Sequence, residues 1–595
     1  MLLYYFIAIF RIQSYILENC GGLLDFSIKI GGEAGQGIQT IGDVLTKVFS
    51  RSGFHVFTHQ DYESRVRGGH NFYQIRLSDK PVFASRKKID IMIAFDEATI
   101  LLHDNEVAEG GILVYDPLIT KRVFEGPHFL KVPFRDLALE SGGSAVTVNT
   151  VAMGVVMGMF GYALEPLLET LPEILKSKDE KNISMNRKAA EIGYGYAGAH
   201  CTQCSFSLPL SSAPLMLIDG NEAIGFGAAA SGCKFYSAYP MTPSTGIMVS
   251  LAKKARDYGI IVEQAEDEIA AINMALGASF AGVRSMTGSS GGGFALMVEG
   301  LSLAAMTETP IVIALAQRPG PATGLPTRTE QGELLFALHA GHGEFPRIIF
   351  APGSPEEAFY LTNKAFDLSQ RFQVPVFILT DQYLADTQWT YEKFDPERLV
   401  YENYRLKDVT AEDAGEYRRH LFTESGISSF ALPGESERLV VTDSDEHDEE
   451  GHLIEDGYIR IKMVRKRYFL KKRAIAAHIG APFFYGSKDP EIIIVGWGST
   501  YGIMKEAVDI LSERKPIAML HFSEIYPFPE REKFDYLDVL RKAAKTISVE
   551  QNATSQFAQL MKTETGYDVT GHINKYDGRP FLVEELVGEI DGFIG

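Results

Sequence analysis

The stretch YPMTPST, residues 239–245, follows an apolar run from Lys234 to Ala238 that is typical of a strand, and a helical pattern begins directly after it. Pro240 and Pro243 restrict φ on either side of Thr242 and favour extended backbone at the residues before them. In open α/β sheets, ligands bind at the carboxyl ends of the strands. The stretch therefore predicts an α/β sheet with the Thr242 hydroxyl fixed at a strand end. On the loop alone, a rigid turn without a ligand is the simpler interpretation.

A second segment, QAEDEIAAINMALGASFAG at residues 264–282, is predicted to form a helix. Glu268 lies in the expected first turn, where a carboxylate interacts favourably with the helix dipole, and burial there would raise its pKa. Such a carboxyl group is suited to sharing a proton with a bound base; a solvent-facing glutamate that only stabilises the helix is the alternative. The helix is expected to bury one apolar stripe, made of Ile269, Ile272, Leu276 and Phe280.

Two further loops follow predicted strands. QRPGPATGLPT at residues 317–327 follows the strand Ile311–Ala316, and its three prolines and two glycines make it stiff and irregular. The planar fork of Arg318 matches a carboxylate, and the hydroxyl of Thr327 would complete the clamp; a proline-rich loop with an exposed arginine is the alternative. The turn TGSSGGG at residues 287–293 has glycines that permit close approach of a ligand or a neighbouring chain.

Strand and helix patterns alternate along most of the chain, which is typical of α/β domains with mostly parallel sheets. The predicted strands cover residues 26–30, 89–95, 111–115, 234–238, 283–287, 311–316, 375–380, 492–495 and 517–520. The expected divisions are an N-terminal extension at 1–25, an α/β domain at 26–198, a linker at 199–214, a second α/β domain at 215–390, a connecting region at 391–485 and a third α/β domain at 486–595.

The bulk composition is that of a soluble globular protein. The chain has 595 residues, of which 45% are hydrophobic and 23% charged, enough for about three or four domains. A net charge of −20 argues against nucleic acid as a partner and would repel an acidic electron carrier, except at a local basic patch or on a partner chain. The apolar run Met1–Phe10 is too short to span a bilayer and lacks the pattern of a signal peptide; it is either a packing helix or the result of a start codon assigned too far upstream. We expect a cytoplasmic protein with no membrane partner.

The four cysteines do not form a disulfide framework, which indicates a reducing compartment. Cys201 and Cys204 form a lone CxxC, interpreted as chance placement rather than a metal or redox site, because only His200 is close enough to add a ligand. Within the connecting region, eight acids lie between Asp443 and Asp456 and eight bases between Arg460 and Arg473. We interpret these blocks as a solvated loop followed by a surface helix; a cation site on the loop or an anion site on the basic run is the alternative.

Several segments in order resemble the α subunit of the 2-oxoacid:ferredoxin oxidoreductases, which are thiamine diphosphate enzymes. These segments are DGNEAIGFGAAASG (219–232), AYPMTPST (238–245), EDEIAAINMALGASFAG (266–282) and QRPGPATGLPT. GGEAGQG (31–37) and ESRVRGGHNFYQIRLSD (63–79) resemble the γ subunit of the same family, and GWGST (496–500), HFSEIYPFP (521–529) and VEQNATSQ (549–556) resemble its C-terminal domain. The resemblance implies a multi-domain α/β fold: a γ-type α/β domain followed by transketolase-like pyrimidine-binding and C-terminal doubly wound domains.

The resemblance also implies roles for single residues. Glu268 would hydrogen-bond the aminopyrimidine ring of the cofactor, with Glu266 as the nearest alternative, and Thr242 would lie beside the reacting carbonyl of the substrate. The remaining implied residues are Arg318 and Thr327 on the substrate carboxylate, Gly288 and Ser289 on the cofactor, and Arg65 and Arg67, with Lys87, on the phosphates of coenzyme A. No metal ligand is expected in this chain.

The implied reaction is thiamine-dependent oxidative decarboxylation of a 2-oxoacid to an acyl-CoA, with coenzyme A as co-substrate and electrons passed to ferredoxin. The chain lacks the Gly-Asp-Gly motif with a following asparagine that binds magnesium and diphosphate, and a lone CxxC cannot supply the four thiolates of an iron–sulfur cluster. A β subunit is therefore expected to carry the diphosphate half of the site, the magnesium ion and the cluster.

Three functions compete at this stage. The γ–α fusion resembles the branch of the family that acts on 2-oxoglutarate or on a broad range of 2-oxoacids. An indolepyruvate or branched-chain 2-oxoacid oxidoreductase subunit is an alternative, although indolepyruvate enzymes usually carry cysteine clusters that this chain lacks. A non-catalytic assembly subunit is the third, and the joint presence of Glu268, Thr242, Arg318 and Thr327 argues against it.

Overall fold

The computed structural model describes residues 24–594 with gaps, so almost all of the predicted extension at 1–25 lies outside the described residues. The gaps are residues 65–67, 144–146, 176–178, 203, 205, 209–212, 407–416 and 436–438. The chain forms two compact units. The first takes residues up to 58, 70–82 and 88–216, and the second takes 59–69, 83–87 and 217–595. Two short pieces of the predicted N-terminal domain therefore belong, by their contacts, to the second unit.

The first unit is built on a mixed sheet in which the strands follow the order β6-β5-β4-β1-β3-β2. Its central strand β1 (Asp25–Glu33) runs parallel to β4 (Ile89–Ala94) and antiparallel to β3 (His70–Ser78). The sheet is thus less parallel than the alternating pattern predicted, because β3 lies antiparallel beside the central strand β1. The other strands are β2 (His55–Asp61), β5 (Val107–Tyr115) and β6 (Phe129–Lys131).

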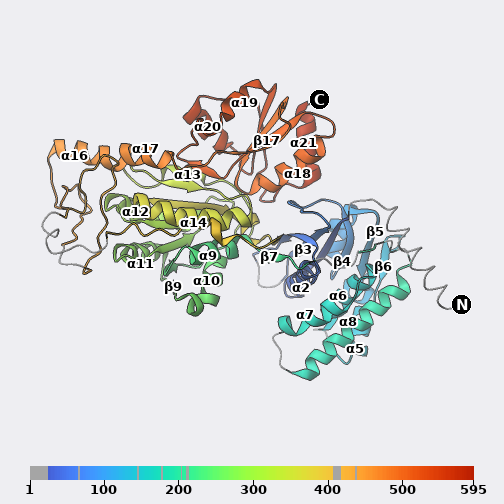
Figure 1. Cartoon of the computed structure of the whole chain (residues 1–595). Helices are drawn as coiled ribbons and strands as arrows, with labels where there is room; N and C mark the ends of the chain where they lie inside the picture. Colours follow the sequence, from blue (N-terminus) through green and yellow to red (C-terminus); the bar gives the residue numbers. More distant parts are fainter. Residues whose placement is uncertain are drawn as a thin grey trace. The chain divides into compact units, whose positions relative to one another are not determined.

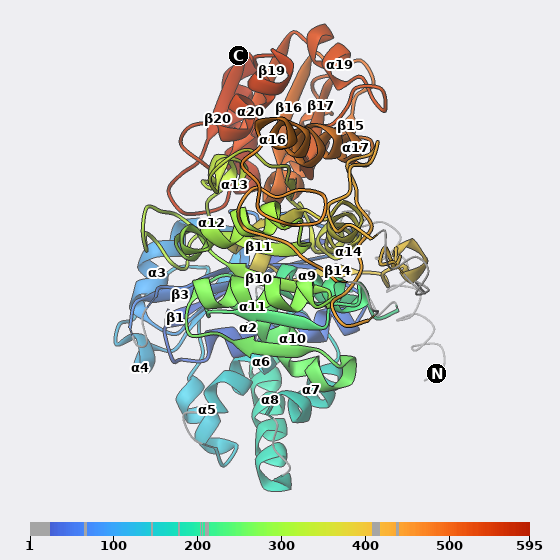
Figure 2. The same cartoon turned by 90° about the vertical axis from the view of Figure 1, so that its left-hand side faces the viewer.

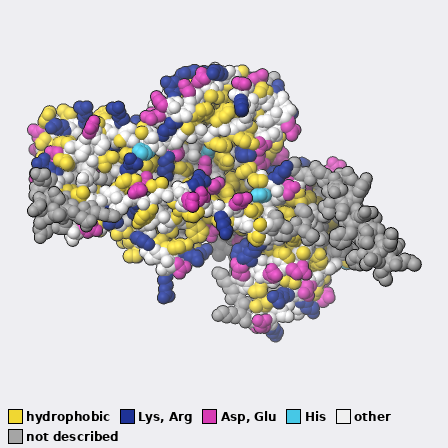
Figure 3. Space-filling view, viewed as in Figure 1, with side chains coloured by type: hydrophobic (Ala, Val, Ile, Leu, Met, Phe, Trp, Pro, Cys, Tyr) yellow, Lys and Arg dark blue, Asp and Glu magenta, His cyan; other side chains and the backbone are white. Residues whose placement is uncertain are grey.

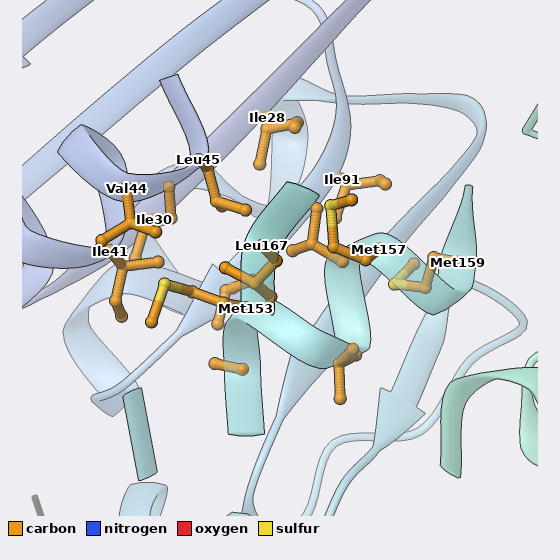
Figure 4. Packing of buried hydrophobic residues seen from close by; sticks show 14 of the residues in the cluster. Ile28, Ile30, Ile41, Val44, Leu45, Ile91, Met153, Met157, Met159 and Leu167 are labelled. Carbon is orange, nitrogen blue, oxygen red and sulfur yellow. The ribbon is translucent and has the colours of Figure 1, made fainter. Parts of the chain in front are cut away.

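Helices cover this sheet and close its core. α2 (Ile38–Arg51) packs against α6 (Val148–Met159) and α7 (Glu165–Leu175), and α8 (Glu180–His200) packs against α6 and α7. Figure 4 shows Ile41, Met153 and Leu167 lying close together in this core, and all three are buried. The largely apolar character of α6 follows from its burial between α2 and α8.

Cys201 and Cys204 follow α8 directly and are joined by a disulfide bond. Both side chains pack, partly buried, against the core of the first unit. The interpretation of this CxxC as chance placement was therefore wrong in one respect, since the backbone after α8 brings the two sulfurs into bonding contact. Cys233, in the second unit, is a buried free thiol.

The second unit contains a sheet with the order β18-β12-β13-β11-β10-β8-β9, and its edge strand β9 is labelled in Figure 1. The four predicted strands of this region are confirmed as β8 (Phe235–Ala238), β10 (Ser285–Ser289), β11 (Ile311–Gln317) and β13 (Pro375–Asp381), and they pair in parallel. Two parallel strands were not predicted, β9 (Ile261–Gln264) and β12 (Ile348–Phe350). Both are four residues long or shorter, so they carry little periodic signal.

Two groups of helices accompany this sheet. In one, α9 (Gly220–Ala230) packs against α10 (Thr245–Tyr258) and α14 (Pro355–Phe372); in the other, α11 (Glu268–Phe280) packs against α12 (Gly291–Met306). Within α11, Ile272 and Leu276 are buried as predicted, but Ile269 is 51% exposed. None of the described helices is long and apolar enough to cross a membrane.

The C-terminal part of the same unit has its own sheet, with the order β15-β17-β16-β19-β20 (Figure 2). The predicted strands are found within β16 (Ile492–Trp497) and β17 (Ile517–Phe522), and α18 (Tyr501–Leu511) lies between them in the chain. The remaining elements are β15 (Phe483–Gly486), β18 (Glu524–Tyr526), β19 (Lys545–Glu550), β20 (Gly571–Asn574), α19 (Tyr536–Lys542), α20 (Gln556–Thr565) and α21 (Val583–Ile594). Trp497 and Phe557 share one core with Leu315 of β11, so the two sheets are packed together.

The basic run in the connecting region lies on α16 (Gly457–Val464), a π-helical segment (Arg465–Leu470) and α17 (Lys471–Ala476). Lys466 and Lys471 are each 1% exposed and form ion pairs with Glu308, which is equally buried at the end of α12. The prediction of a solvated surface helix was therefore wrong for this part of the run, because a distant carboxylate compensates the two buried charges. Burial raises the pKa of the Glu308 carboxyl, but the two ammonium groups outweigh it and hold the pKa well below its ordinary value.

We expect Glu308→Gln to lower the free energy of unfolding by about 3–5 kcal/mol, because it leaves two buried ammonium groups without a charge partner. Since the pKa of Glu308 is depressed by folding, its contribution is present at neutral pH and is lost as the pH falls below the ordinary glutamate pKa. Urea unfolding at neutral and acid pH measures both effects. Lys542→Met, which breaks an exposed pair with Asp538, serves as a control and should change stability far less than Glu308→Gln. Equal effects of the two substitutions would contradict the structural role of Glu308.

Candidate active site

The parallel strands β8, β10 and β11 carry their loops to one edge of the sheet, and two predicted site residues meet there. The guanidinium of Arg318, just after β11, donates a hydrogen bond from Nη1 to the carbonyl oxygen of Thr242 at 2.8 Å. Asn221 in α9 supports the same loop, because its Nδ2 donates to the carbonyl oxygen of Pro243 at 3.2 Å. The loop after β8 is thus held by side chains from two other elements, which fixes Thr242.

Glu268 is the first residue of α11 and is buried, with 4% of its surface exposed. The helix begins there because Asp267 accepts a hydrogen bond from the Ala270 N–H, at 2.8 Å. Glu268 Oε1 is buried and has no hydrogen-bond partner among the described residues. Glu266 is exposed, so the structure distinguishes the two candidate glutamates by burial.

The carboxyl group of Glu268 lies against the first turn of α12. A Cβ atom added to Gly293 would lie 2.5 Å from Glu268 Oε1 and 2.1 Å from Ser289 Oγ, so only glycine leaves room for both side chains. At the neighbouring Gly292, the nearest atom to an added Cβ is the Ala322 carbonyl oxygen, at 3.8 Å. The glycine-rich turn therefore contributes space for Glu268 at one specific position.

Gly288 and Ser289, the predicted cofactor contacts, are the last residues of β10 and are buried. A Cβ on Gly288 would lie 2.6 Å from the Tyr236 hydroxyl, so packing against β8 accounts for this glycine. Ser289 Oγ contacts Met241 Sδ at 3.8 Å and links the turn to the loop that carries Thr242. The next residue, Ser290, is buried, and its Oγ has no partner within the described part of the chain.

Thr327 lies at the far end of the Arg318 loop and contacts a segment from the N-terminal sequence. Its hydroxyl donates a hydrogen bond to the Tyr62 carbonyl oxygen at 2.6 Å, and the next residue, Arg328, forms an ion pair with Asp61. Thr327 has one hydroxyl hydrogen, and the bond to Tyr62 occupies it. Residues 65–67, which include two of the three predicted coenzyme A ligands, Arg65 and Arg67, lie outside the described residues.

Several buried polar atoms at this edge have no hydrogen-bond partner within the described structure. Leaving such an atom unsatisfied costs about 1–3 kcal/mol, so a cluster of them indicates a ligand that supplies the missing partners. These atoms are Asn221 Oδ1, Tyr236 Oη, Glu268 Oε1, Ser290 Oγ, Arg318 Nε and Glu333 Oε2. Asn221, Ser290 and Glu333 were not predicted from the sequence; the first two lie in segments already singled out there, whereas Glu333 lies outside every motif.

Large apolar side chains are exposed on the two helices that begin at this edge. Ile269 and Met274 of α11 are 51% and 43% exposed, and Leu296 of α12 is 52% exposed. In Figure 3 hydrophobic side chains are visible on this part of the surface. The prediction of a buried stripe on α11 was therefore wrong for Ile269, because helical periodicity alone does not distinguish a core-facing position from an exposed one.

Two protein families match the chain. Residues 226–466 match "Pyruvate flavodoxin/ferredoxin oxidoreductase, thiamine diP-bdg", and residues 27–196 match "Pyruvate ferredoxin/flavodoxin oxidoreductase". The α subunit of a 2-oxoacid:ferredoxin oxidoreductase from Sulfolobus sp is 33% identical over 94% of this chain and 95% of its own length. The chain belongs to the 2-oxoacid:ferredoxin oxidoreductases. The predicted family is thereby confirmed, and with it the assignment to the oxidoreductases.

Other members of the family agree with this assignment. The 2-oxoglutarate oxidoreductase subunit KorA of Mycobacterium tuberculosis is 28% identical over 94% of this chain and 90% of its own length. The solved 2-oxoglutarate:ferredoxin oxidoreductase of Magnetococcus marinus, with 2-oxoglutarate, coenzyme A and succinyl-CoA bound, superposes with a TM-score of 0.89 at 30% identity, over 96% of this chain and 100% of that one. The predicted multi-domain α/β fold is confirmed by this match.

The glycine-rich turn gives a test with a matched control. We expect Gly293→Ala to displace the Glu268 carboxyl group and to weaken binding of thiamine diphosphate to the assembled oxidoreductase by about tenfold or more, equivalent to about 1.4 kcal/mol. Gly292→Ala adds the same methyl group on the same turn, but into free space, and should leave affinity within about twofold. Titration of the two purified variants by isothermal calorimetry distinguishes them. Equal affinities would show that the first turn of α12 does not position a cofactor-binding group.

Proposed function

We propose that this chain is the catalytic α subunit of a 2-oxoacid:ferredoxin oxidoreductase and that it holds the aminopyrimidine of thiamine diphosphate together with the 2-oxoacid. The observation that carries the proposal is the buried, unpartnered oxygen of Glu268 at the sheet edge where Arg318 and Thr242 meet. A buried carboxylate without a partner is costly in an isolated protein, and a nitrogen base of a ligand would supply the missing hydrogen bond.

The residues at the edge fit the pyrimidine half of this cofactor. Glu268 would exchange a proton with a ring nitrogen of the aminopyrimidine, and Ser289 and Gly288 would form the adjoining floor of the pocket. Thiamine diphosphate, when bound, supplies a carbon nucleophile and an electron sink for decarboxylation. The protein's own contribution is to orient the ring, to hold the proton at Glu268 and to keep water from the reacting carbon.

Arg318 and Thr242 are proposed to position the 2-oxoacid. Burial lowers the pKa of Arg318, but a guanidinium remains charged at physiological pH and can bind the substrate carboxylate. The Thr242 hydroxyl would lie beside the carbonyl that reacts. Thr327 is proposed to act at the same carboxylate-binding site, because its hydrogen bond to Tyr62 holds the Arg318 loop in place. Because the carboxylate leaves as carbon dioxide, Arg318 serves positioning more than transition-state binding.

We propose 2-oxoglutarate as the substrate, on the similarity to the 2-oxoglutarate oxidoreductases of M. marinus and M. tuberculosis. The second candidate is a broad range of 2-oxoacids, in line with the name of the Sulfolobus relative, a 2-oxoacid:ferredoxin oxidoreductase. Indolepyruvate and branched-chain 2-oxoacids are the remaining candidate substrates to be compared. Coenzyme A is the proposed acyl acceptor. Arg65 and Arg67 remain candidate ligands for its phosphates, since the preceding residues Asp61 and Tyr62 are attached to the substrate loop.

A β subunit is proposed to complete the site. It would carry the diphosphate-binding half, the magnesium ion and the iron–sulfur cluster that passes electrons to ferredoxin. The exposed apolar side chains of α11 and α12, which begin beside Glu268 and Ser290, support a covering partner at this place. The relatives from Sulfolobus and Aeropyrum pernix are themselves named as α subunits, so each belongs to an assembly of more than one chain.

Amide replacement of the two glutamates tests the proposal in the complex reconstituted with the β chain. We expect Glu268→Gln to reduce 2-oxoacid-dependent, coenzyme A-dependent reduction of ferredoxin or a viologen dye by about 100-fold or more, because it removes a proton-transfer group. Glu266→Gln, an exposed site two residues away, should leave the rate within about twofold. Size-exclusion chromatography establishes that both variants assemble. Wild-type rates for Glu268→Gln would favour a non-catalytic assembly subunit.

A further inference from the structure

Glu333 is a half-buried acidic residue at the candidate site, with a buried carboxyl oxygen, Oε2, and no role in the proposal above. It follows the Arg318 loop and is the residue before α13 (Leu334–His339). Its backbone N–H donates to Gln317 Oε1 at 2.9 Å, and Gln317 is the last residue of β11, directly before Arg318. Glu333 therefore belongs to the same sheet edge as Arg318, although fifteen positions separate them in sequence.

The segment before Glu333 is fixed from the C-terminal part of the unit. Gln331 donates from its backbone N–H to the Gln551 carbonyl oxygen at 2.7 Å, and its Nε2 donates to the Trp497 carbonyl oxygen at 2.8 Å. After it, the Leu335 N–H donates to Gln556 Oε1 at 3.0 Å. Glu333 is thus held on both sides by the C-terminal sheet and its helix α20, and its side chain has a defined position.

The carboxyl group of Glu333 lies on the first turn of α12. The backbone N–H of Gly291 donates a hydrogen bond to it, and a Cβ atom on Gly291 would lie only 1.6 Å from Oε1. The second oxygen, Oε2, is buried and has no partner in the part of the chain that the structure describes. Two carboxyl groups therefore meet the same helix turn, Glu268 at Gly293 and Glu333 at Gly291, and each has one oxygen left over for a ligand.

The charged groups that interact with Glu333 are Arg318 from the loop after β11 and Glu330 from its own segment; Glu268 from α11 lies on the same first turn of α12, at Gly293. Arg318 attracts Glu333 electrostatically, but no ion pair joins them among the described residues, and Arg318 Nε has no partner either. Burial raises the pKa of Glu333 to about 8; Arg318 and the Gly291 N–H oppose this rise, and Glu330 adds to it. Below this pKa the carboxyl group of Glu333 holds a proton, and its Oε2 has no partner among the described residues.

We propose that neutral Glu333 is a substrate-binding residue that donates a hydrogen bond from Oε2 to the 2-oxoacid carboxylate held by Arg318. The inference rests on the proposed function, in which Arg318 grips that carboxylate. Oε2–H of Glu333 and Nε–H of Arg318 are two unused donors on adjacent segments, and a carboxylate offers two acceptor oxygens. An ionised Glu333 would instead repel the substrate and compete with it for the guanidinium.

The pH dependence of kcat/KM in the reconstituted complex tests this role. For the wild type we expect kcat/KM to fall above about pH 8, approaching tenfold per pH unit, as Glu333 loses its proton. Glu333→Gln keeps a neutral donor of the same shape, so kcat/KM at neutral pH should stay within about threefold and the alkaline fall attributed to Glu333 should disappear. Glu330→Gln is the matched control: it should retain the fall, moved to slightly lower pH because one neighbouring negative charge is gone.

Binding of N-oxalylglycine, an amide analogue of 2-oxoglutarate that cannot be decarboxylated, provides a readout without turnover. Calorimetry at about pH 9 in two buffers of different ionisation enthalpy should show uptake of about one proton by the wild-type complex and none by Glu333→Gln. Retention of the alkaline fall in Glu333→Gln, a loss of activity as large as in Glu333→Ala, or analogue binding without proton uptake would overturn the role of Glu333 alone. Failure of the wild-type complex to bind the analogue would contradict the proposed function as well.

Discussion

Parallel pairing of β8, β10 and β11 is the constraint on which the site depends. In the ladder, Met286 of the middle strand lies opposite Tyr236 on one side and Val312 on the other, so all three strands end at nearly the same level. Their carboxyl ends must therefore share one edge of the sheet, and the loops that leave them are adjacent whatever their sequence. In the sequence, Ser290 follows Thr242 by more than forty residues, and Arg318 follows Ser290 by almost thirty. The sheet alone brings the three residues together.

This arrangement places two carboxyl groups on one helix turn. Glu268 and Glu333 both face the start of α12, where the helix dipole favours negative charge. Burial beside Glu330 keeps a proton on Glu333, whereas Glu268 is proposed to exchange its proton with the cofactor. Their unpaired oxygens are costly in the protein alone, and the contacts of Gln331 with the C-terminal sheet hold the surrounding segment in place. The unpaired oxygens thus destabilise the protein at the site, and the packing of the two sheets compensates, as is common for binding sites.

The local sequence pattern was sufficient to predict the elements that bury long apolar runs. It failed to predict the environment of a residue whose partner is distant in the sequence. β11 and β13 are seven-residue, fully buried strands and were found; β9 and β12 are too short to show a period. Lys466 was expected in water because its partner Glu308 lies 158 positions earlier. Glu268, Thr242 and Arg318 were identified from motifs. Glu333 was not, because its significance comes from burial against Gly291, which only the fold reveals.

The most direct test of the account is a cryo-EM structure of the complex of this chain with its β chain, thiamine diphosphate and N-oxalylglycine. The account predicts a ring nitrogen of the aminopyrimidine within about 2.6–3.2 Å of a Glu268 carboxylate oxygen, with Arg318 on the carboxylate of the analogue and the diphosphate held by the β chain. An aminopyrimidine bound away from the edge formed by β8, β10 and β11, or a complete cofactor site within this chain alone, would contradict it.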